Sequence, residues 1–343
     1  MADGDSHIGT PLFKNSLNLN SKKLKTVPTC VSGLTTLSVL LLSYNSITDL
    51  PAEMISLQQL AELNLGNNAL KELPAVLGHL ESLKKLYLFR NQIAVVPSDA
   101  IGGLRNLVVL NLNHNKIQRL PAEMRSLRNL EHLSVLDNKL EEIPVELGHL
   151  TKLTEINLTS NKLSCLPQQL YCCRELRKLY VARNKLTSLP EGITALAKLQ
   201  VLDVAGNKLS MFPVEFHLLP LKELHCEGNK FVQCEPVPSL PYSVLTLKEL
   251  VARFILQENR DRSSLIHMTL PHYPSLNSLL DSSSYCALCH TPVFSTWLNC
   301  VHFINLKRDM NIRCSLTIPV RALLCSQKCF NAGGYSYCGV GTR

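Results

Sequence analysis

Four cysteines near the C-terminus have the residue type and the spacing of metal ligands. Two residues separate Cys286 from Cys289, and three separate Cys325 from Cys329. Each short loop can direct two thiolates at one ion, and four thiolates suit the tetrahedral coordination of zinc. The sequence therefore predicts a structural zinc site at these four cysteines, closed to further ligands and without an open position for catalysis.

An alternative interpretation is that these cysteines are buried thiols, which pack as small apolar side chains. The wider spacing of the second pair makes the motif less specific. His290, Cys300, His302 and Cys314 lie nearby and are further candidate ligands. The segment between the two pairs is rich in strand-forming residues, and we expect it to form the ribbon that carries both loops.

Composition places the chain in a reducing compartment. It has 343 residues, 13 cysteines and a net charge of +8. Its first residues, MADGDSHIGTPLFK, lack the basic start and apolar stretch of a signal peptide, and no apolar run approaches the ~20 residues of a membrane helix. Thiols stay reduced in the cytosol, so we expect a cytoplasmic protein that does not enter membranes. The positive charge is dispersed and has no nucleic-acid-binding motif around it, which argues against nucleic acid as a partner.

Most of the chain repeats one pattern, and Leu130–Pro144, LEHLSVLDNKLEEIP, is a clear copy of it. Leucines, one asparagine and one proline occupy fixed positions that recur every 22 to 24 residues. A period of this length with these residues predicts a leucine-rich repeat solenoid. The repeated asparagines are Asn45, Asn68, Asn91, Asn115, Asn138, Asn161, Asn184, Asn207 and Asn229.

The pattern within each repeat predicts an α/β fold, a right-handed horseshoe with a parallel concave sheet. Alternating leucines point inward from a short strand, and stacked turns share the core that none can form alone. The asparagine amide can bond buried backbone groups of adjacent turns. The proline starts an irregular or short helical return segment.

We divide the chain into four regions. A leader and capping repeat occupy 1–36, and nine repeats occupy 37–236. A linker and an amphipathic helix occupy 237–284, and the cysteine-rich tail occupies 285–343. We expect the first 15 residues to be disordered.

The side chains between the inward leucines form the surface that solenoids use for binding. Exposed aromatic and arginine side chains dominate protein interfaces, and several cluster here within neighbouring turns. This predicts a protein ligand on the concave face, although isolated surface aromatics also occur without a partner. The candidate contacts are Tyr87, Phe89, Arg90, His114, His132, Leu136, Asp137, Tyr180 and Arg183.

The segment 246–257, TLKELVARFILQ, predicts an amphipathic helix. Leu247, Leu250, Val251, Phe254 and Ile255 share one face at helical spacing. This face can serve as a C-terminal cap of the last repeat, because a terminal repeat needs a cover. It can also dock in the groove of a partner. The two roles compete for the same side chains.

The repeats and tail together resemble an intracellular leucine-rich repeat family with a cysteine-rich C-terminal tail, over nearly the full length. The resemblance rests on short segments, such as LVVLNLNHNKIQRLP in the repeats and CALC, VFSTWLNCVHF and LLCSQKCF in the tail. The tail segments identify the family more specifically than the repeat segments do. This resemblance implies no particular activity.

The helix is also similar to the elongin-binding helix of suppressor-of-cytokine-signalling boxes. Thr246, Leu247 and Ile255 match that motif, whereas Val251 stands where a smaller residue is usual. Further on, the segment from Leu270-Pro271 is similar to the Leu-Pro-x-Pro segment that contacts cullin-5, with one extra residue before the second proline. The similarity implies elongin B/C and cullin-5 as partners of a ubiquitin-ligase substrate receptor.

The sequence offers no constellation of catalytic residues. It has no phosphate-binding glycine loop at a strand–helix junction, no His–Glu zinc motif and no nucleophile elbow. We therefore expect an interaction protein without an enzymatic activity.

Overall fold

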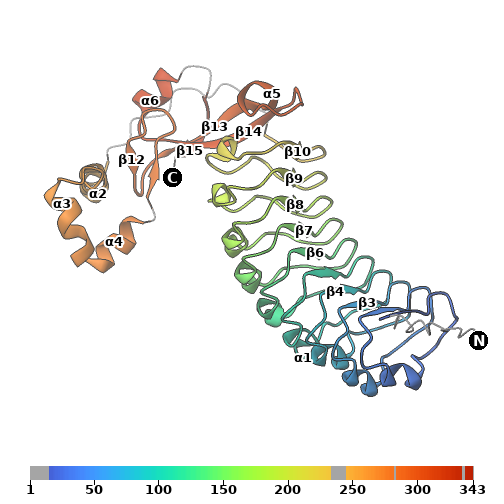
Figure 1. Cartoon of the computed structure of the whole chain (residues 1–343). Coiled ribbons are helices and arrows are strands. Elements are labelled where there is room, and N and C mark those ends of the chain that lie inside the picture. The colour runs from blue at the N-terminus through green and yellow to red at the C-terminus, as the bar shows by residue number, and fades with distance from the viewer. Residues whose placement is uncertain (1–14, 233–244, 282, 334–336, 343) are drawn as a thin grey trace, which may run out of the picture. The chain divides into compact units, whose positions relative to one another are not determined.

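The computed structural model describes residues 15–232, 245–281, 283–333 and 337–342 (Figure 1). Nearly all of the predicted disordered leader, and the predicted proline-rich linker, lie outside these residues. The chain forms two compact units, Met1–Asn184 and Lys185–Arg343. Both contain turns of the predicted leucine-rich repeat solenoid, so the fold class is confirmed.

The first unit contains a parallel sheet of short strands that pair in chain order. From the second strand on, the middle residue of each strand is buried and its neighbours are at least partly exposed, as the alternating leucines predict. Corresponding residues of adjacent repeats pair, which keeps the leucines in register. The strands are β1 (Ser16–Asn18), β2 (Val39–Leu41), β3 (Glu62–Asn64), β4 (Lys85–Tyr87), β5 (Val109–Asn111), β6 (His132–Ser134), β7 (Glu155–Asn157) and β8 (Lys178–Tyr180).

Short helical segments return the chain to the next strand (Figure 1). Each follows a proline, whose fixed φ suits the entry to a helix and whose missing N–H leaves no donor unpaired. Their buried apolar residues complete the core behind the sheet. The return segments are the 3₁₀ helices η1 (Thr29–Gly33), η2 (Ala52–Ser56), η3 (Ala75–His79), η4 (Ala122–Ser126), η5 (Val145–His149) and η6 (Gln168–Cys172), and the short α-helix α1 (Ser98–Gly102).

The predicted asparagine ladder is present. The Asn138 amide nitrogen donates to the carbonyl oxygens of Leu112 and Val135 at 3.0 and 3.2 Å, and its oxygen accepts from the Ile117 N–H at 3.0 Å. One buried side chain thus bonds backbone groups of its own turn and of the preceding one. Equivalent bonds form at the other described repeats, for example at Asn91.

The second unit begins with the last repeats. It contains η7 (Ile193–Ala195), β9 (Val201–Asp203), η8 (Phe216–Leu218) and β10 (Glu223–His225), and β9 pairs with β10 in parallel.

The C-terminal part of this unit combines helices with two antiparallel sheets. Strands β11 (Ser284–Tyr285) and β12 (Pro292–Val293) form a hairpin, and a three-stranded sheet has the order β14-β13-β15. Its strands are β13 (Leu298–Asn305), β14 (Thr317–Leu324) and β15 (Tyr337–Thr342). The helices are α2 (Leu247–Glu258), α3 (Leu265–Thr269), η9 (Leu270–His272), α4 (Pro274–Leu280), α5 (Leu306–Asp309) and α6 (Gln327–Ala332).

Strand β14 contacts the last repeats through Phe212. The Phe212 N–H donates to the Pro319 carbonyl at 2.9 Å, and the Arg321 N–H donates to the Phe212 carbonyl at 2.9 Å. The buried Phe212 ring also stacks on Phe216, with ring centroids 4.2 Å apart. A strand of the tail therefore covers apolar side chains where the repeats end.

Candidate metal centre and interaction surfaces

The four predicted zinc ligands come from two loops of the tail. Cys286 and Cys289 lie in the turn between β11 and β12, where the His290 N–H donates to the Cys286 carbonyl at 3.0 Å. Cys325 directly follows β14, and Cys329 lies in α6, whose N-cap Ser326 accepts a hydrogen bond from the Cys329 N–H at 3.3 Å. The Ala287 N–H donates to the Leu323 carbonyl at 2.8 Å and holds the first loop against β14.

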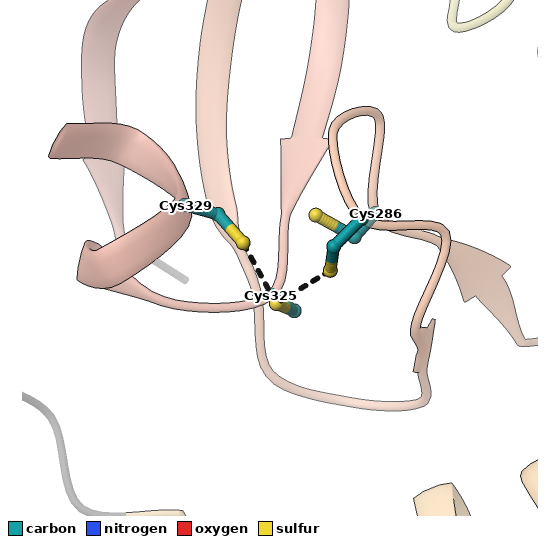
Figure 2. A group of neighbouring side chains, drawn as sticks. Cys286, Cys325 and Cys329 are labelled. Carbon is teal, nitrogen blue, oxygen red and sulfur yellow. Dashed lines mark hydrogen bonds between the residues drawn. The ribbon is translucent and has the colours of Figure 1, made fainter. Parts of the chain in front are cut away.

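The structure brings the four sulfur atoms together. All four lie within 4.8 Å of one another. The Cys325 Sγ lies 3.5 Å from the Cys329 Sγ (Figure 2). It also lies 3.5 Å from the Cys289 Sγ. Zinc–sulfur bonds of about 2.3 Å in a tetrahedron place the sulfurs about 3.8 Å apart. The donor set and its spacing therefore fit one tetrahedral zinc ion.

The pKa values of these thiols diverge. Burial alone raises the pKa of Cys289, but hydrogen bonds with Thr291, Cys325 and Cys286 outweigh burial and lower it to about 6. Burial is the main cause of the raised pKa values of Cys325 and Cys329. Without a metal, these effects favour a thiolate at Cys289 and protonated thiols at Cys325 and Cys329, where burial and nearby negative charge both oppose ionisation. A divalent cation would offset that negative charge and displace the protons.

An apolar cluster supports the cysteine site. Cys286 and Cys329 pack in it with Leu298, Cys300 and Leu324. Groups of three or more His, Cys, Asp or Glu side chains can share a metal ion when they lie close together. Among the described residues, only the four predicted cysteines form such a group. Cys300, although buried in the same cluster, does not belong to that group, and neither do the other spare candidates named from the sequence.

A buried ion pair joins α2 to the tail, and the sequence analysis did not anticipate it. The fully buried Glu249 carboxylate accepts hydrogen bonds from the N–H groups of Phe294, Ser295 and Thr296 at 3.0, 2.6 and 3.0 Å. Arg253, one helical turn later, donates from Nε to the Glu249 Oε1 at 2.5 Å.

These hydrogen bonds determine the protonation state of Glu249. Burial alone raises the pKa of this carboxyl, but the bonds from Phe294, Arg253 and Ser295 outweigh burial and lower it to about 2. The residue therefore stays ionised at neutral pH. The sequence signal was the i,i+4 spacing of Glu249 and Arg253, a spacing that also describes ordinary exposed pairs on a helix surface.

The predicted helix is present, and its apolar face is exposed. Leu247 and Phe254 have exposed fractions of 77% and 60%, and Leu250 and Val251 are exposed as well. Helix α2 instead buries its opposite face, which includes Glu249 and Arg253. The predicted C-terminal helix therefore exists, but α2 does not use these apolar residues to cover the repeats.

The residues matched to the elongin and cullin motifs have different surroundings. Leu247 and Pro271 are exposed, and Ile255 is half-buried. Leu270 is buried, in a cluster that also contains Phe294. Thr246 is the N-cap of α2, and its hydroxyl accepts a hydrogen bond from the Glu249 N–H at 3.2 Å. Of the four predicted contacts, Leu247 has an exposed fraction of 77%, whereas Leu270 is buried.

All nine predicted concave-face residues lie in the first unit, on the strands β4, β5, β6 and β8 or within three residues after them. We call this surface the strand face. Tyr87, Phe89, Leu136 and Tyr180 are half-buried. The exposed members are Arg90, His114, His132, Asp137 and Arg183.

Several strand-face residues adopt a left-handed backbone conformation that the sequence analysis missed. Arg90, His114, Asp137 and Arg183 have φ values of 52° to 56°, and each directly precedes a ladder asparagine. Gly206 and Gly228 occupy the same position in later repeats, with φ values of 65° and 70°. These glycines mark the repeat position with a left-handed backbone in the sequence, because glycine adopts this conformation without strain.

Polar and charged side chains on and beside the strand face pair between turns. The His114 Nδ1 lies 2.9 Å from the Asp137 Oδ2, and the Lys178 Nζ lies 3.2 Å from the Glu155 Oε2. Exposed pairs of this kind contribute little to stability, typically less than about 1 kcal/mol. Their side chains can therefore be redirected to a ligand at low cost.

The Phe89 ring is held against the preceding turn. A Cβ atom added to Gly66 would lie 2.4 Å from this ring, so the aromatic side chain covers the bare backbone of the glycine. An aromatic side chain fixed in this way loses little conformational freedom when it binds a ligand.

The model of the Leucine rich repeat family matches residues 35–93, 82–140 and 128–186. These matches agree with the strands, return segments and asparagine ladder described above. The repeats of this chain have the leucine-rich repeat fold. This fold is that of a protein-interaction module, in which stacked turns present an extended binding surface.

The chain is similar to leucine-rich repeat-containing protein 69 of Xenopus laevis, with 42% identity over 134 residues. The matched region covers 38% of this chain and 39% of the relative. The family resemblance is thus confirmed, over a smaller share of the chain than the nearly full length expected.

Solved structures extend the similarity of the repeats. A leucine-rich repeat protein of Leptospira interrogans has 36% identity and a TM-score of 0.60, covering 63% of this chain and 55% of that one. The ectodomain of the membrane receptor kinase GASSHO1/SCHENGEN3 of Arabidopsis thaliana, in complex with CASPARIAN STRIP INTEGRITY FACTOR 2, has 28% identity and a TM-score of 0.52. The matched region covers 66% of this chain and 31% of the plant chain. In the part of the chain that the structure describes, no helix combines the length and apolar character needed to cross a bilayer.

Proposed function

We propose that this chain is a non-enzymatic scaffold protein whose strand face binds a protein ligand. The observation that carries the proposal is the gathering of nine aromatic, charged and aliphatic residues on neighbouring turns of one unit. Phe89 is a pre-positioned aromatic anchor, and Arg90 lies beside it in the chain. Such residues supply most of the binding energy in protein interfaces.

The comparison structures support a binding role. The similar Arabidopsis ectodomain was solved in complex with a named factor. In the present chain, the Lys178–Glu155 pair provides both signs of charge beside Tyr180. Paired charges at the rim of an interface favour specificity and association rate more than affinity.

Comparative affinity capture tests this proposal. The wild-type chain and a Tyr87→Ala, Phe89→Ala, Arg90→Ala variant would be used to capture cytosolic proteins. Each captured protein would then be purified and its Kd measured with both chains. We expect the variant to bind at least about tenfold more weakly, as loss of an interface anchor does. Arg119→Ala is the matched control, since Arg119 is exposed and lies outside the strand face. Equal binding of all three chains would contradict the proposal.

A second candidate function is that of a substrate receptor for an elongin B/C–cullin-5 ubiquitin ligase. The exposed Leu247 favours it, because the matched motif uses this leucine as the side chain that inserts into elongin C. Glu249 and Arg253 hold α2 on the tail from the opposite side, which leaves the apolar face accessible. In this role the strand face would select the substrate.

Co-purification with elongin B/C tests the second function. The wild-type chain should retain elongin B/C, and Leu247→Ser should lose it. Leu265→Ser is the control, because Leu265 is a comparably exposed leucine on α3. Failure of the wild-type chain to bind, or equal binding by Leu247→Ser, would reject this function and leave the strand-face proposal intact.

We also propose that Cys286, Cys289, Cys325 and Cys329 hold one structural zinc ion in the cytoplasm. The sulfur spacing supports this assignment, and the cytoplasm keeps such thiols reduced and able to bind metal. Four protein ligands would leave no coordination position for a substrate.

A further inference from the structure

The first unit carries a basic cavity away from the strand face. It has a volume of about 710 Å³ and lies at the turns that connect α1, η4 and η5 to the strands β5, β6 and β7. Arg105, Arg125, Arg128 and His149 line it. We call these four residues the arginine groove.

The positive charge of the arginine groove is uncompensated within the described chain. None of the described lining residues is acidic. Across residues 15–232, 245–281, 283–333 and 337–342, the guanidinium groups of Arg105, Arg125 and Arg128 form no ion pair or hydrogen bond. Three like charges in one cavity repel one another, so an anion bound between them gains energy from each.

Hydrogen bonds between turns fix the backbone beneath these arginines. The Asn129 Nδ2 donates to the Arg105 carbonyl at 3.0 Å, and the Lys152 Nζ donates to the Asn129 Oδ1 at 2.8 Å. Arg105 and Arg128 occupy equivalent positions of successive repeats. The stacking of the turns therefore fixes the distance between the backbone positions that carry the two guanidinium groups. Gly102 and Gly148 occupy the positions of adjacent turns that correspond to Arg125, and no side chain there competes for its space.

The charge and shape of the groove select the chemical class of its ligand. A guanidinium group presents a planar fork of N–H donors, which matches two oxygens of a carboxylate or a phosphate. A carboxylate carries one negative charge and would leave most of the positive charge uncompensated. A phosphate monoester carries a charge of about −2 and three terminal oxygens, so more than one arginine can bind it.

Other anionic partners fit the lining less well. None of the described lining residues is Phe, Tyr or Trp, whereas single-stranded nucleic acid is held largely by stacking on such rings. None is a large apolar residue that would insert into a membrane surface. We infer that the arginine groove binds phosphate monoester groups, carried either by a phosphorylated protein segment or by a free phosphate ester. This inference does not depend on the strand-face proposal.

Calorimetric titration of the full chain at low ionic strength tests the inference. The probes are O-phosphoserine, a flexible Gly-Ser peptide with one phosphoserine, and the same peptide with glutamate in place of the phosphoserine. We expect both phosphorylated probes to bind at least about tenfold more tightly than the glutamate peptide, because charge-assisted bonds to the additional oxygens are lost with a carboxylate. Tighter binding of the phosphopeptide than of O-phosphoserine identifies a phosphorylated protein as the source. Equal binding identifies a free phosphate ester.

Two matched variants locate the site. Arg128→Gln should weaken binding of the phosphorylated probes by about tenfold or more, since it removes one charged fork. Arg174→Gln should leave it unchanged, because Arg174 has the equivalent position in a later repeat but does not line the cavity. Circular dichroism would verify that both variants are folded. Equal binding of the glutamate peptide, or equal losses in the two variants, would overturn the assignment.

Discussion

The Arg253 guanidinium donates a hydrogen bond from Nη1 to the carbonyl oxygen of Cys325, at 3.2 Å. One side chain of α2 thereby contacts the backbone of a candidate zinc ligand. Its Nη2 also donates to the Thr296 carbonyl at 2.6 Å. The turn that follows α2 reaches the first cysteine loop as well, because Arg260 donates to the His290 carbonyl at 2.9 Å. The position of α2 and the geometry of the cysteine site therefore depend on each other.

Removal of the metal ligands should unfold the tail and leave the repeats folded. In the variant with Cys286→Ser and Cys325→Ser, zinc binding energy no longer stabilises the two loops, and this energy is folding energy for such sites. Trp297 is the only tryptophan of the chain and lies beside Thr296, so its fluorescence reports on the tail. We expect a fluorescence change with most of the far-ultraviolet circular dichroism of the repeats retained.

Metal analysis completes this test. The wild-type chain should contain about one zinc per molecule, as a single tetrahedral site requires. Cys314→Ser is the control, because Cys314 lies in the tail but outside the group of four. Wild-type protein without zinc after purification under reducing conditions would contradict the assignment.

Glu249→Gln should destabilise the tail by about 3 kcal/mol. Loss of the carboxylate leaves the buried Arg253 charge without its partner, and breaking a buried pair in this way typically costs about 3–5 kcal/mol. Urea unfolding followed by Trp297 fluorescence measures the change. Glu258→Gln, on the same helix, should shift stability by less than about 0.5 kcal/mol. Similar midpoints for the two variants would show that the Glu249 bonds do not stabilise the tail.

Acid should remove the stability that the ionised Glu249 carboxylate contributes to the tail. The pKa of Glu249 is lowered from 4.5 to about 2 in the folded chain. The resulting stability is fully present above pH 4.5 and is lost as the pH falls towards 2, because the unfolded state then binds the proton first. The shift corresponds to about 3 kcal/mol. Carboxyl NMR of the wild-type chain measures this pKa directly, and a value near 4.5 would refute the prediction.

Asn138→Leu should lower the stability of the first unit by a few kcal/mol. The substitution leaves the Leu112 carbonyl and the Ile117 N–H without the bonds that Asn138 provides. Each buried group left without a partner costs about 1–3 kcal/mol. Denaturant unfolding followed by circular dichroism measures the loss. Lys139→Leu is the control, since this adjacent side chain is exposed. An unchanged midpoint for Asn138→Leu would argue against the ladder.

The sequence alone determined the repeat architecture, because each position of the repeat has one physical requirement. Leu133 must be buried, and the Asn138 amide must form hydrogen bonds with two turns. The same requirements recur every 22 to 24 residues, as the stacked turns of a solenoid demand. The four cysteines were equally readable, since two short loops with paired thiols restrict where the sulfur atoms can point.

Only the tertiary structure decided which face of α2 is buried. Helical spacing groups Leu247 with Phe254, and hydrophobicity alone would bury them. The backbone N–H groups of residues 294–296, however, need an acceptor, and the Glu249 carboxylate supplies it from the opposite face. These groups are distant in sequence and adjacent in space. A buried charge is favourable only when it has hydrogen-bonding partners of this kind. Local sequence patterns do not show which distant residues supply them.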